Sequence, residues 1–188
     1  VHLGENGMWG KDTSFEVANR IPLLISIPGV TKANTKNRNF VELVDIFPTL
    51  IEAAQLPAVP MCPRESSGWA FCTEGVSFLP LLTGKGPTHW KNRVYWQGRW
   101  NFDNARYNAY TVRTDGYRYT EYVEHTDGFP REWSKEPKAT ELYDKKMDPG
   151  ENMNLWNDSN YAGVMKDLSE KLHAGWRSAL PRGIFADD

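Results

Sequence analysis

The stretch Tyr107–Val123, which reads YNAYTVRTDGYRYTEYV, indicates a β-hairpin. Tyr, Val and Thr are frequent on both sides of Asp115-Gly116, and these residue types favour strands. An Asp-Gly pair between two such runs is a strong signal for a two-residue hairpin turn. We therefore predict antiparallel strands over residues 107–114 and 117–123.

The predicted sheet continues on both sides of this hairpin. Residues Arg93–Gln97 read RVYWQ and have the same strand composition. From Tyr161 onward, apolar side chains recur every three or four residues, which is the pattern of an amphipathic helix. The polar cluster at 157–160 precedes this pattern and can cap the helix. We predict that this helix lies on the sheet through Val164, Met165, Leu168, Leu172 and Trp176.

The earlier part of the chain has a different pattern, which indicates an α/β fold. Residues Ile21–Ile27 read IPLLISI, and the run stops at Pro28-Gly29. A short apolar run between turn residues is typical of a strand that is buried on both faces of a parallel or mixed sheet. We predict such a strand here.

Two helices are predicted after this strand. Val41–Leu50 reads as a strand that passes into a helix, with Asp45 as the N-cap and Pro48 in the first turn, where no intrahelical donor is needed. Leu50, Ile51 and Ala54 would then face the core. A second, short helix is predicted between Gly75 and Gly84, with Ser77 near its start and Gly84 as its stop.

The composition excludes some classes of protein. The 188-residue chain has a net charge of −2, and its Lys and Arg residues are scattered, which argues against nucleic acid as a partner. No apolar run approaches the roughly 20 residues of a transmembrane helix, so we expect no membrane span. The chain begins at Val1, with neither an initiator Met nor a targeting segment, and we expect a fragment or a processed chain.

Cys62 and Cys72 are the only cysteines, and a loop containing Pro63 separates them. This spacing is compatible with a local disulfide, which would place the protein in an oxidising compartment; two unrelated thiols are the alternative. The sequon at Asn157 (Asn-Asp-Ser) adds weak support for a secreted or lumenal, including lysosomal, location and predicts a glycosylation site.

The opening run Val1–Lys11, VHLGENGMWGK, is a glycine-rich loop that ends in a lysine before the predicted strand. Loops of this kind carry functional residues in many α/β proteins. Taken alone, Lys11 is more commonly a solvated surface lysine.

This loop resembles a segment of the sulfatases, and in particular of sulfatases of the iduronate 2-sulfatase kind. There, an Asp-His-Gly with metal ligands is followed by Leu-Gly-Glu-His-Gly-x-Trp-x-Lys, which Leu3-Gly4-Glu5, Gly7, Trp9 and Lys11 match. The metal ligands would thus lie immediately before Val1. The resemblance covers nearly the whole chain, including both cysteines. Further matching segments are Asn19–Leu23, Val41–Leu50, Leu79–Leu82, Val112–Thr114, Tyr117–Thr120, Glu141–Asp144, Asp148-Pro149 and Asn154-Leu155.

The resemblance implies hydrolysis of a sulfate ester of a saccharide substrate by a formylglycine nucleophile and a calcium ion. Formylglycine is made from a Cys/Ser-x-Pro-x-Arg motif, which this sequence lacks, so both groups are expected in an upstream half, the chain's implied partner. Lys11 matches the lysine that stabilises charge on the sulfate and the bridging oxygen. The implied fold is the closing section of a mixed α/β catalytic domain, residues 1–90, followed by a small antiparallel-sheet subdomain with a terminal helix, residues 91–188.

The sequence departs from the family pattern around the expected substrate wall. Asn6 replaces the second His of the loop, Val1 replaces an aromatic residue, and Asp12 stands where the iduronate enzyme has Tyr. His2 and Asp12 are predicted substrate-wall residues, and a structural role is the alternative for His2. These departures leave the identity of the sugar, a sulfated uronate or another saccharide, open.

Two other functions remain open from the sequence. One is a phosphodiesterase or phosphonate ester hydrolase on the same alkaline-phosphatase-like scaffold. The other is a non-catalytic carbohydrate-binding or matrix protein derived from the enzyme.

Overall fold

A computed structural model of the chain describes residues 1–63, 71–87, 89–102, 104–125 and 136–181. The chain forms two compact units. The first contains Val1–Pro22 and Arg93–Ala179, and the second is built on Leu23–Asn92. The expected boundary near residue 90 concerns the domains of the whole protein and stays a prediction.

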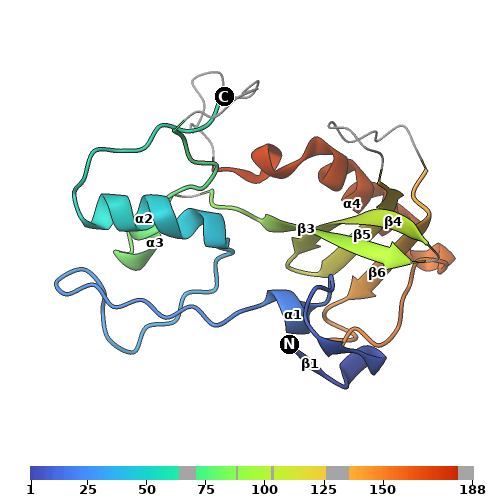
Figure 1. Cartoon of the computed structure of the whole chain (residues 1–188). Helices are drawn as coiled ribbons and strands as arrows, with labels where there is room; N and C mark the ends of the chain where they lie inside the picture. Colours follow the sequence, from blue (N-terminus) through green and yellow to red (C-terminus); the bar gives the residue numbers. More distant parts are fainter. Residues whose placement is uncertain (64–70, 88, 103, 126–135, 182–188) are drawn as a thin grey trace. The chain divides into compact units, whose positions relative to one another are not determined.

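The first unit is built on a four-stranded antiparallel sheet in the order β3-β4-β5-β6 (Figure 1). The strands are β3 (Arg93–Phe102), β4 (Ala105–Thr114), β5 (Tyr117–Glu124) and β6 (Ala139–Asp144). The predicted hairpin is confirmed, since Arg113 pairs with Arg118 across Asp115-Gly116. The Thr114 hydroxyl accepts a hydrogen bond from the Tyr117 backbone N–H at 3.2 Å and helps to close the turn. Strand β6 was not predicted as a strand.

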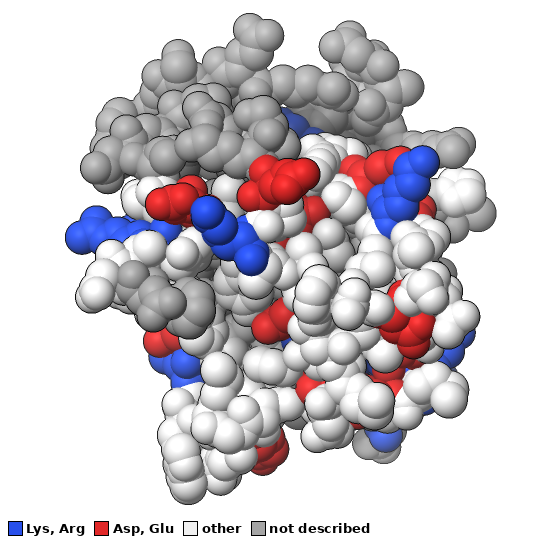
Figure 2. Space-filling model, turned by 90° about the vertical axis from the view of Figure 1, so that its right-hand side faces the viewer, with Lys and Arg blue, Asp and Glu red and all other residues white. Residues whose placement is uncertain are grey.

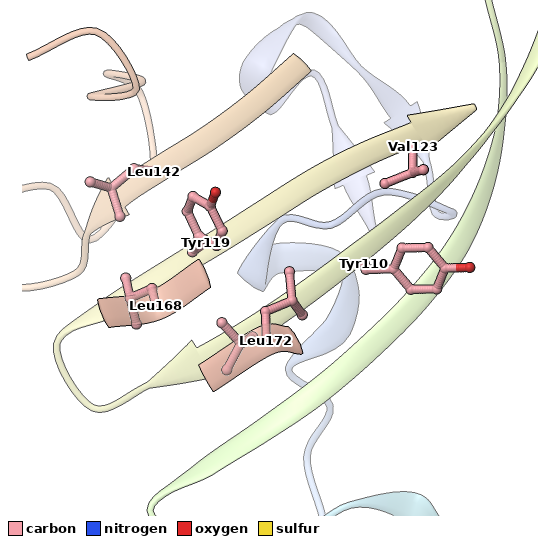
Figure 3. Packing of buried hydrophobic residues seen from close by; sticks show 7 residues of the cluster. Tyr110, Tyr119, Val123, Leu142, Leu168 and Leu172 are labelled. Atoms are coloured by element: carbon pink, nitrogen blue, oxygen red, sulfur yellow. The ribbon is translucent and has the colours of Figure 1, made fainter. Parts of the chain in front are cut away.

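Helix α4 (Ala162–Ala174) covers one face of this sheet, as predicted, but it ends before Trp176, which was expected to lie on it. Alternate residues of a strand point to opposite faces of the sheet. The apolar side chains of one face pack against Leu168 and Leu172 of α4, which are both buried (Figure 3). A 3₁₀ turn, η3 (Ser159–Tyr161), precedes the helix, and the Asp158 carboxylate accepts from the Asn160 N–H at 2.9 Å. The polar cluster therefore caps the 3₁₀ turn η3, whereas α4 itself begins after Tyr161 without a side-chain cap, so the predicted cap of the helix is wrong. The helix is followed by η4 (Trp176–Ala179), and the sheet side of the core consists of Tyr110, Val112, Tyr119, Val123 and Leu142.

The opening segment lies on the opposite face of the sheet (Figure 1). It contains β1 (His2–Leu3), η1 (Glu5–Gly7), β2 (Trp9–Gly10) and α1 (Glu16–Asn19). The sheet residues on this face are mostly polar or charged, and the opening segment contacts them through Phe15 and Glu16. The sheet is thus covered on an apolar face by α4 and on a polar face by the segment that carries Lys11.

The second unit contains η2 (Leu43–Asp45), α2 (Ile46–Ala53) and α3 (Leu79–Leu82). Asp45 occupies the N-cap position of α2, but its carboxylate does not cap this helix. It is fully buried and binds the Lys91 ammonium at 2.8 Å and the Val76 N–H at 2.8 Å. The predicted entry strand at Val41 is wrong, because a 3₁₀ turn begins α2 instead.

The predicted inner face of α2 is also wrong in part. Leu50 and Ala54 are exposed, and Thr49 is the buried residue of this helix. The Thr49 hydroxyl donates to the Asp45 carbonyl oxygen at 2.6 Å and accepts from the Phe78 N–H at 3.0 Å. Polar bonding therefore decides which side of α2 packs within this unit. The short helix α3 is confirmed, with the Ser77 hydroxyl accepting from Leu79 N–H and with Gly84 in the left-handed conformation after its end.

The predicted buried strand at Ile21–Ile27 is not present. These residues form an irregular segment, in which Leu24 is 88% exposed. A strand buried on both faces needs neighbouring strands for its backbone and covering layers for its side chains. No described strand of the chain pairs with this segment.

The predicted disulfide joins Cys62 and Cys72, whose Cα atoms are 4.9 Å apart. Met61 and Thr73, next to the two cysteines, form a parallel β-bridge that holds the ends of this loop together. Among the described residues on the face shown in Figure 2, acidic and basic side chains are interspersed. Within the described ranges, every helix is too short or too polar to cross a membrane.

Candidate functional site

Lys11 follows a small hairpin whose two strands are paired through His2 with Gly10 and Leu3 with Trp9. Gly10 has a φ of 90°, which a residue with a side chain rarely adopts, so the turn into Lys11 requires glycine. Lys11 itself is exposed and makes no hydrogen bond or ion pair with any residue that the structure describes. Its ammonium is therefore available to a ligand.

His2 lies in the first strand of this hairpin, and its side chain is held by hydrogen bonds within the loop. Its side chain is fully buried, and its Nε2 lies 2.7 Å from Thr13 Oγ1 while its Nδ1 lies 3.0 Å from the Glu5 carbonyl oxygen. Both ring nitrogens of His2 are thus engaged, one with Glu5, which precedes Lys11 in the sequence, and one with Thr13, which follows it. This arrangement favours the structural role that the sequence left open for His2, and its place in a substrate wall stays a prediction.

Asp12 and Glu5 are the acidic residues of the loop near Lys11. Asp12 is exposed and has a φ of 73°, in the left-handed region that residues other than glycine rarely adopt. The Glu5 carboxylate accepts a hydrogen bond from the Leu3 N–H at 2.6 Å, and this bond lowers the pKa of Glu5. Contact of Asp12 with a substrate stays a prediction.

Glu16 ties the end of the loop to the sheet. Its Oε2 accepts from Arg113 Nε of β4 at 2.7 Å, and Lys145 Nζ lies 3.9 Å from the same oxygen. Burial raises the pKa of Glu16, but the hydrogen bond and charge of Arg113 outweigh it, and the pKa lies below its ordinary value. Glu16 is therefore held in its charged form.

Arg118 of β5 occupies the centre of the polar face of the sheet. Its guanidinium carbon lies 4.7 Å from the Phe15 ring centroid and 4.5 Å from that of Tyr143. Its Nε binds Glu151 Oε1 at 2.9 Å and its Nη1 binds Glu141 Oε2 at 3.0 Å. A buried arginine with two carboxylate partners is fixed in orientation. The opening segment therefore packs through Phe15 against a rigidly held group.

Two tyrosines next to this arginine are held in their neutral form. Tyr122 donates its hydroxyl to Glu141 Oε1 at 3.0 Å. Burial, followed by the charge of Glu141, raises the pKa of Tyr143 to about 12, and the same two causes raise the pKa of Tyr122. These groups therefore serve packing and hydrogen bonding and do not exchange protons near neutral pH.

Sequence reasoning missed the charged anchor of the loop, namely Glu16, Arg113, Arg118 and Glu151. A signal was present, because the charged Arg118 lies between Tyr117 and Tyr119 within a predicted strand that also contains Glu121. Charged side chains in a strand that is covered on both faces need buried partners. What the strand pattern could not show is that the opening segment supplies some of those partners.

The described residues contain no group of three or more His, Cys, Asp or Glu side chains that could hold a metal ion. A calcium site needs six to eight oxygen ligands. The described part of this chain therefore does not fit a complete calcium site of its own. The predicted glycosylation site Asn157 is exposed in a turn before η3, and its modification stays a prediction.

A family model, described as N-sulphoglucosamine sulphohydrolase, C-terminal, matches residues 4–177. The chain belongs to this sulfatase family. The chain is 31% identical to mouse iduronate 2-sulfatase over 213 aligned residues, which cover 88% of the chain and 38% of the relative. It is 27% identical to the N-acetylglucosamine-6-O-sulfatase of Bacteroides thetaiotaomicron over 173 residues, which cover 90% and 27%. This sulfatase section thus spans well under half the length of these curated relatives.

Two solved structures show the same fold as this sulfatase section. The structure of BT4656 in complex with its substrate D-glucosamine-2-N,6-O-disulfate aligns with a TM-score of 0.71 at 24% identity, over 95% of this chain and 32% of that one. A phosphonate monoester hydrolase of Agrobacterium radiobacter aligns with a TM-score of 0.52 at 24% identity, over 77% and 26%. The predicted sulfatase membership and the mixed α/β fold class are confirmed.

Proposed function

We propose that this chain is the C-terminal section of an enzyme that hydrolyses sulfate esters of saccharides, and that Lys11 contacts the sulfate. The observation that carries the proposal is the family match over residues 4–177, which includes Lys11. Lys11 is exposed, has no partner among the described residues and follows a firmly anchored hairpin. The printed names of two relatives, iduronate 2-sulfatase and N-acetylglucosamine-6-O-sulfatase, support a sulfated uronate or amino sugar as substrate, as found in glycosaminoglycans.

The role of Lys11 follows from the charge of the reaction. Cleavage of a sulfate ester leaves negative charge on the sulfate oxygens and on the departing alcohol oxygen. A compact ammonium placed near both stabilises the transition state more than the bound ester, provided that water is largely excluded. The nucleophile, a formylglycine in the proposed enzyme, and a calcium ion would be supplied by the upstream part of the protein.

The surface of the second unit supports an upstream partner within the same protein. Leu43, Phe47 and Leu50 recur at helical spacing along η2 and α2 and are 65%, 48% and 54% exposed. An apolar stripe of this kind is normally buried against another element. Because the curated relatives are much longer than this chain, we propose that the upstream part of the protein covers this stripe and pairs with the irregular Ile21–Ile27 segment.

The disulfide supports a secreted, lysosomal or other lumenal location for the protein. Disulfides persist in oxidising compartments and are rare in a reducing cytosol. Glycosylation of Asn157 would be available on the same route, since this asparagine is exposed.

Turnover by the complete protein tests the function. We expect hydrolysis of an aryl sulfate and of a sulfated monosaccharide, and a fall in kcat of about 100-fold in Lys11→Ala, the usual effect of losing one preorganised charge. Lys166→Ala removes an exposed lysine of α4 and serves as the matched control, with unchanged kcat expected. A kcat of Lys11→Ala equal to that of wild type would contradict the assigned role.

A phosphonate ester hydrolase is the second candidate, because the Agrobacterium radiobacter enzyme shares the fold. The fold alone does not select the ester. The same assay with a phenyl phosphonate monoester separates the two, and a higher kcat/KM for the phosphonate than for the sulfate would favour this candidate. Absence of turnover on both esters by the complete, metal-loaded protein would favour a non-catalytic, carbohydrate-binding protein.

A further inference from the structure

Glu151 joins the Lys11 loop at two places that lie on either side of Lys11 in the sequence. Its backbone carbonyl accepts a hydrogen bond from Asn6 Nδ2 at 2.9 Å. Its carboxylate Oε2 accepts from the Glu16 N–H at 2.7 Å. Lys11 is midway between Asn6 and Glu16 along the chain, so one residue holds both ends of the segment that carries it.

The other carboxylate oxygen of Glu151 is bound to the sheet. Oε1 accepts from Arg118 Nε at 2.9 Å and lies 3.2 Å from Lys145 Nζ. Arg118 is itself buried between aromatic rings and fixed by Glu141. The Glu151 side chain is only 2% exposed, so its bonds to the loop and to the sheet do not compete with water.

The backbone of Glu151 is also unusual. Its φ is 58°, in the left-handed region that residues other than glycine rarely adopt. The Glu151 N–H donates to the Asp148 carbonyl at 3.1 Å, and the Asp148 carboxylate accepts from the N–H groups of Asn152 and Met153. This turn holds the carbonyl of Glu151 toward Asn6 while its carboxylate points into the protein.

We propose that Glu151 is a positioning residue for Lys11, which fixes the Asn6–Glu16 segment on the sheet. The inference rests on the proposed function, because the role of Lys11 is assigned there. Lys11 makes no contact of its own with the described residues that would hold its ammonium, so its position depends on the loop backbone. An electrostatic contribution to a transition state requires that the charge is already in place, and small displacements are costly.

Hydrogen exchange of the complete protein tests the anchor independently of activity. Glu151→Ala is expected to raise the exchange rates of backbone amides in residues 6–16 at least tenfold, while the α4 amides keep their rates. Glu121→Ala is the matched control, because Glu121 of β5 is an equally buried carboxylate but binds Ser169 and His173 of α4. That variant is expected to loosen α4 and to leave residues 6–16 unchanged.

Glu151→Gln separates anchoring of the loop from neutralisation of Arg118. The amide oxygen of Gln can still accept from the Glu16 N–H, but it carries no charge for Arg118 and Lys145. We expect Gln to retain most of the protection of residues 6–16 and most of the kcat. If Gln behaves like Ala in both measurements, the carboxylate acts only as a counter-charge and the inference is overturned. Glu151→Gln also supplies the test if Glu151→Ala does not fold.

A double-mutant cycle with Lys11→Ala tests whether Glu151 acts through Lys11. Glu151→Ala alone is expected to lower kcat by about 10- to 100-fold. In the Lys11→Ala background the same change is expected to lower kcat by less than about threefold, because the charge to be positioned is gone. A residue that only stabilises the fold would lower kcat by the same factor in both backgrounds, which would overturn the inference.

The two proposals fail in different ways. Unchanged exchange of residues 6–16 in Glu151→Ala, together with a large loss of kcat in Lys11→Ala, overturns the inference alone. Wild-type kcat in Lys11→Ala overturns the proposed role of Lys11 and with it the catalytic consequence of Glu151, while the exchange rates still decide whether Glu151 anchors the loop.

Discussion

Arg113 Nε lies 2.7 Å from Glu16 Oε2, and this ion pair joins strand β4 to helix α1 across 97 residues of sequence. Both side chains are partly buried, and each is 20% exposed. The pair holds the segment that carries Lys11 on the sheet at a point next to the bond between the Glu16 N–H and Glu151. An ion pair between fully exposed side chains would contribute little to stability. This pair is partly buried and links two segments that are 97 residues apart in the chain.

The first prediction concerns the pH dependence of this pair. The pKa of Glu16 is lowered in the folded protein, so its charged form stabilises the fold at pH values above the unfolded pKa of about 4.3. This contribution is lost as the pH falls through the lower, folded pKa. We expect Glu16→Gln to lower the free energy of unfolding of the complete protein at pH 7, and the difference from wild type to shrink below about pH 4.

Urea unfolding at several pH values measures this difference. Glu170→Gln on the exposed surface of α4 is the control and should not alter the pH dependence. A difference between Glu16→Gln and wild type that stays constant from pH 7 to about pH 3 would contradict the assignment.

The second prediction concerns the buried pair of the second unit. Lys91→Ala should lower the free energy of unfolding by about 3 to 5 kcal/mol, because it leaves the fully buried Asp45 carboxylate without a counter-charge. Lys36→Ala, an exposed lysine of the same unit, should change it by less than about 0.5 kcal/mol. Denaturant unfolding of the complete protein compares the two, and equal effects would show that Asp45 is solvated.

The third prediction concerns packing under α4. Leu172→Ala should cost about 2 to 5 kcal/mol of stability, since it leaves a cavity between the helix and the sheet. Met153→Ala, in an exposed turn, should be nearly neutral. A loss below about 1 kcal/mol for Leu172→Ala in thermal or urea unfolding would mean that α4 is not firmly packed on the sheet.

The fourth prediction concerns the disulfide between Cys62 and Cys72. The native protein should bind no alkylating reagent at these residues, and reduction should raise its intact mass by two hydrogens. Closing a loop of about ten residues restricts the unfolded chain, so reduction should destabilise the protein by up to about 3 kcal/mol. Two thiols that alkylate freely before reduction would remove the support for an oxidising compartment.

The fifth prediction concerns the 188-residue chain by itself. It supplies Lys11 but no Cys/Ser-x-Pro-x-Arg motif and, within its described residues, no cluster of metal ligands. Purified chain incubated with an aryl sulfate and calcium should therefore stay at background. Turnover above background that disappears in Lys11→Ala would show that the active site has been assigned to the wrong residues.

Local patterns predicted the elements that are stabilised by neighbours in the sequence. The Asp115-Gly116 hairpin, the strands around it and helix α4 were all predicted, because turn chemistry and apolar periodicity are local properties. Strand β6 was missed because its short run ATELYD alternates too weakly to be distinguished from a loop. The strand at Ile21–Ile27 was wrongly predicted, because a run of apolar residues shows a tendency to be buried and does not supply the strands that would bury it.

The sequence by itself determined the family, the hairpin, the amphipathic helix and the glycine-rich loop with Lys11. Only the tertiary structure decided that this loop covers the polar face of the sheet and that Glu16, Arg113, Arg118 and Glu151 hold it there. The physical reason is that these ion pairs join residues far apart in the chain. A charged residue shows in a sequence that it needs a partner when buried, but the partner is selected by the fold.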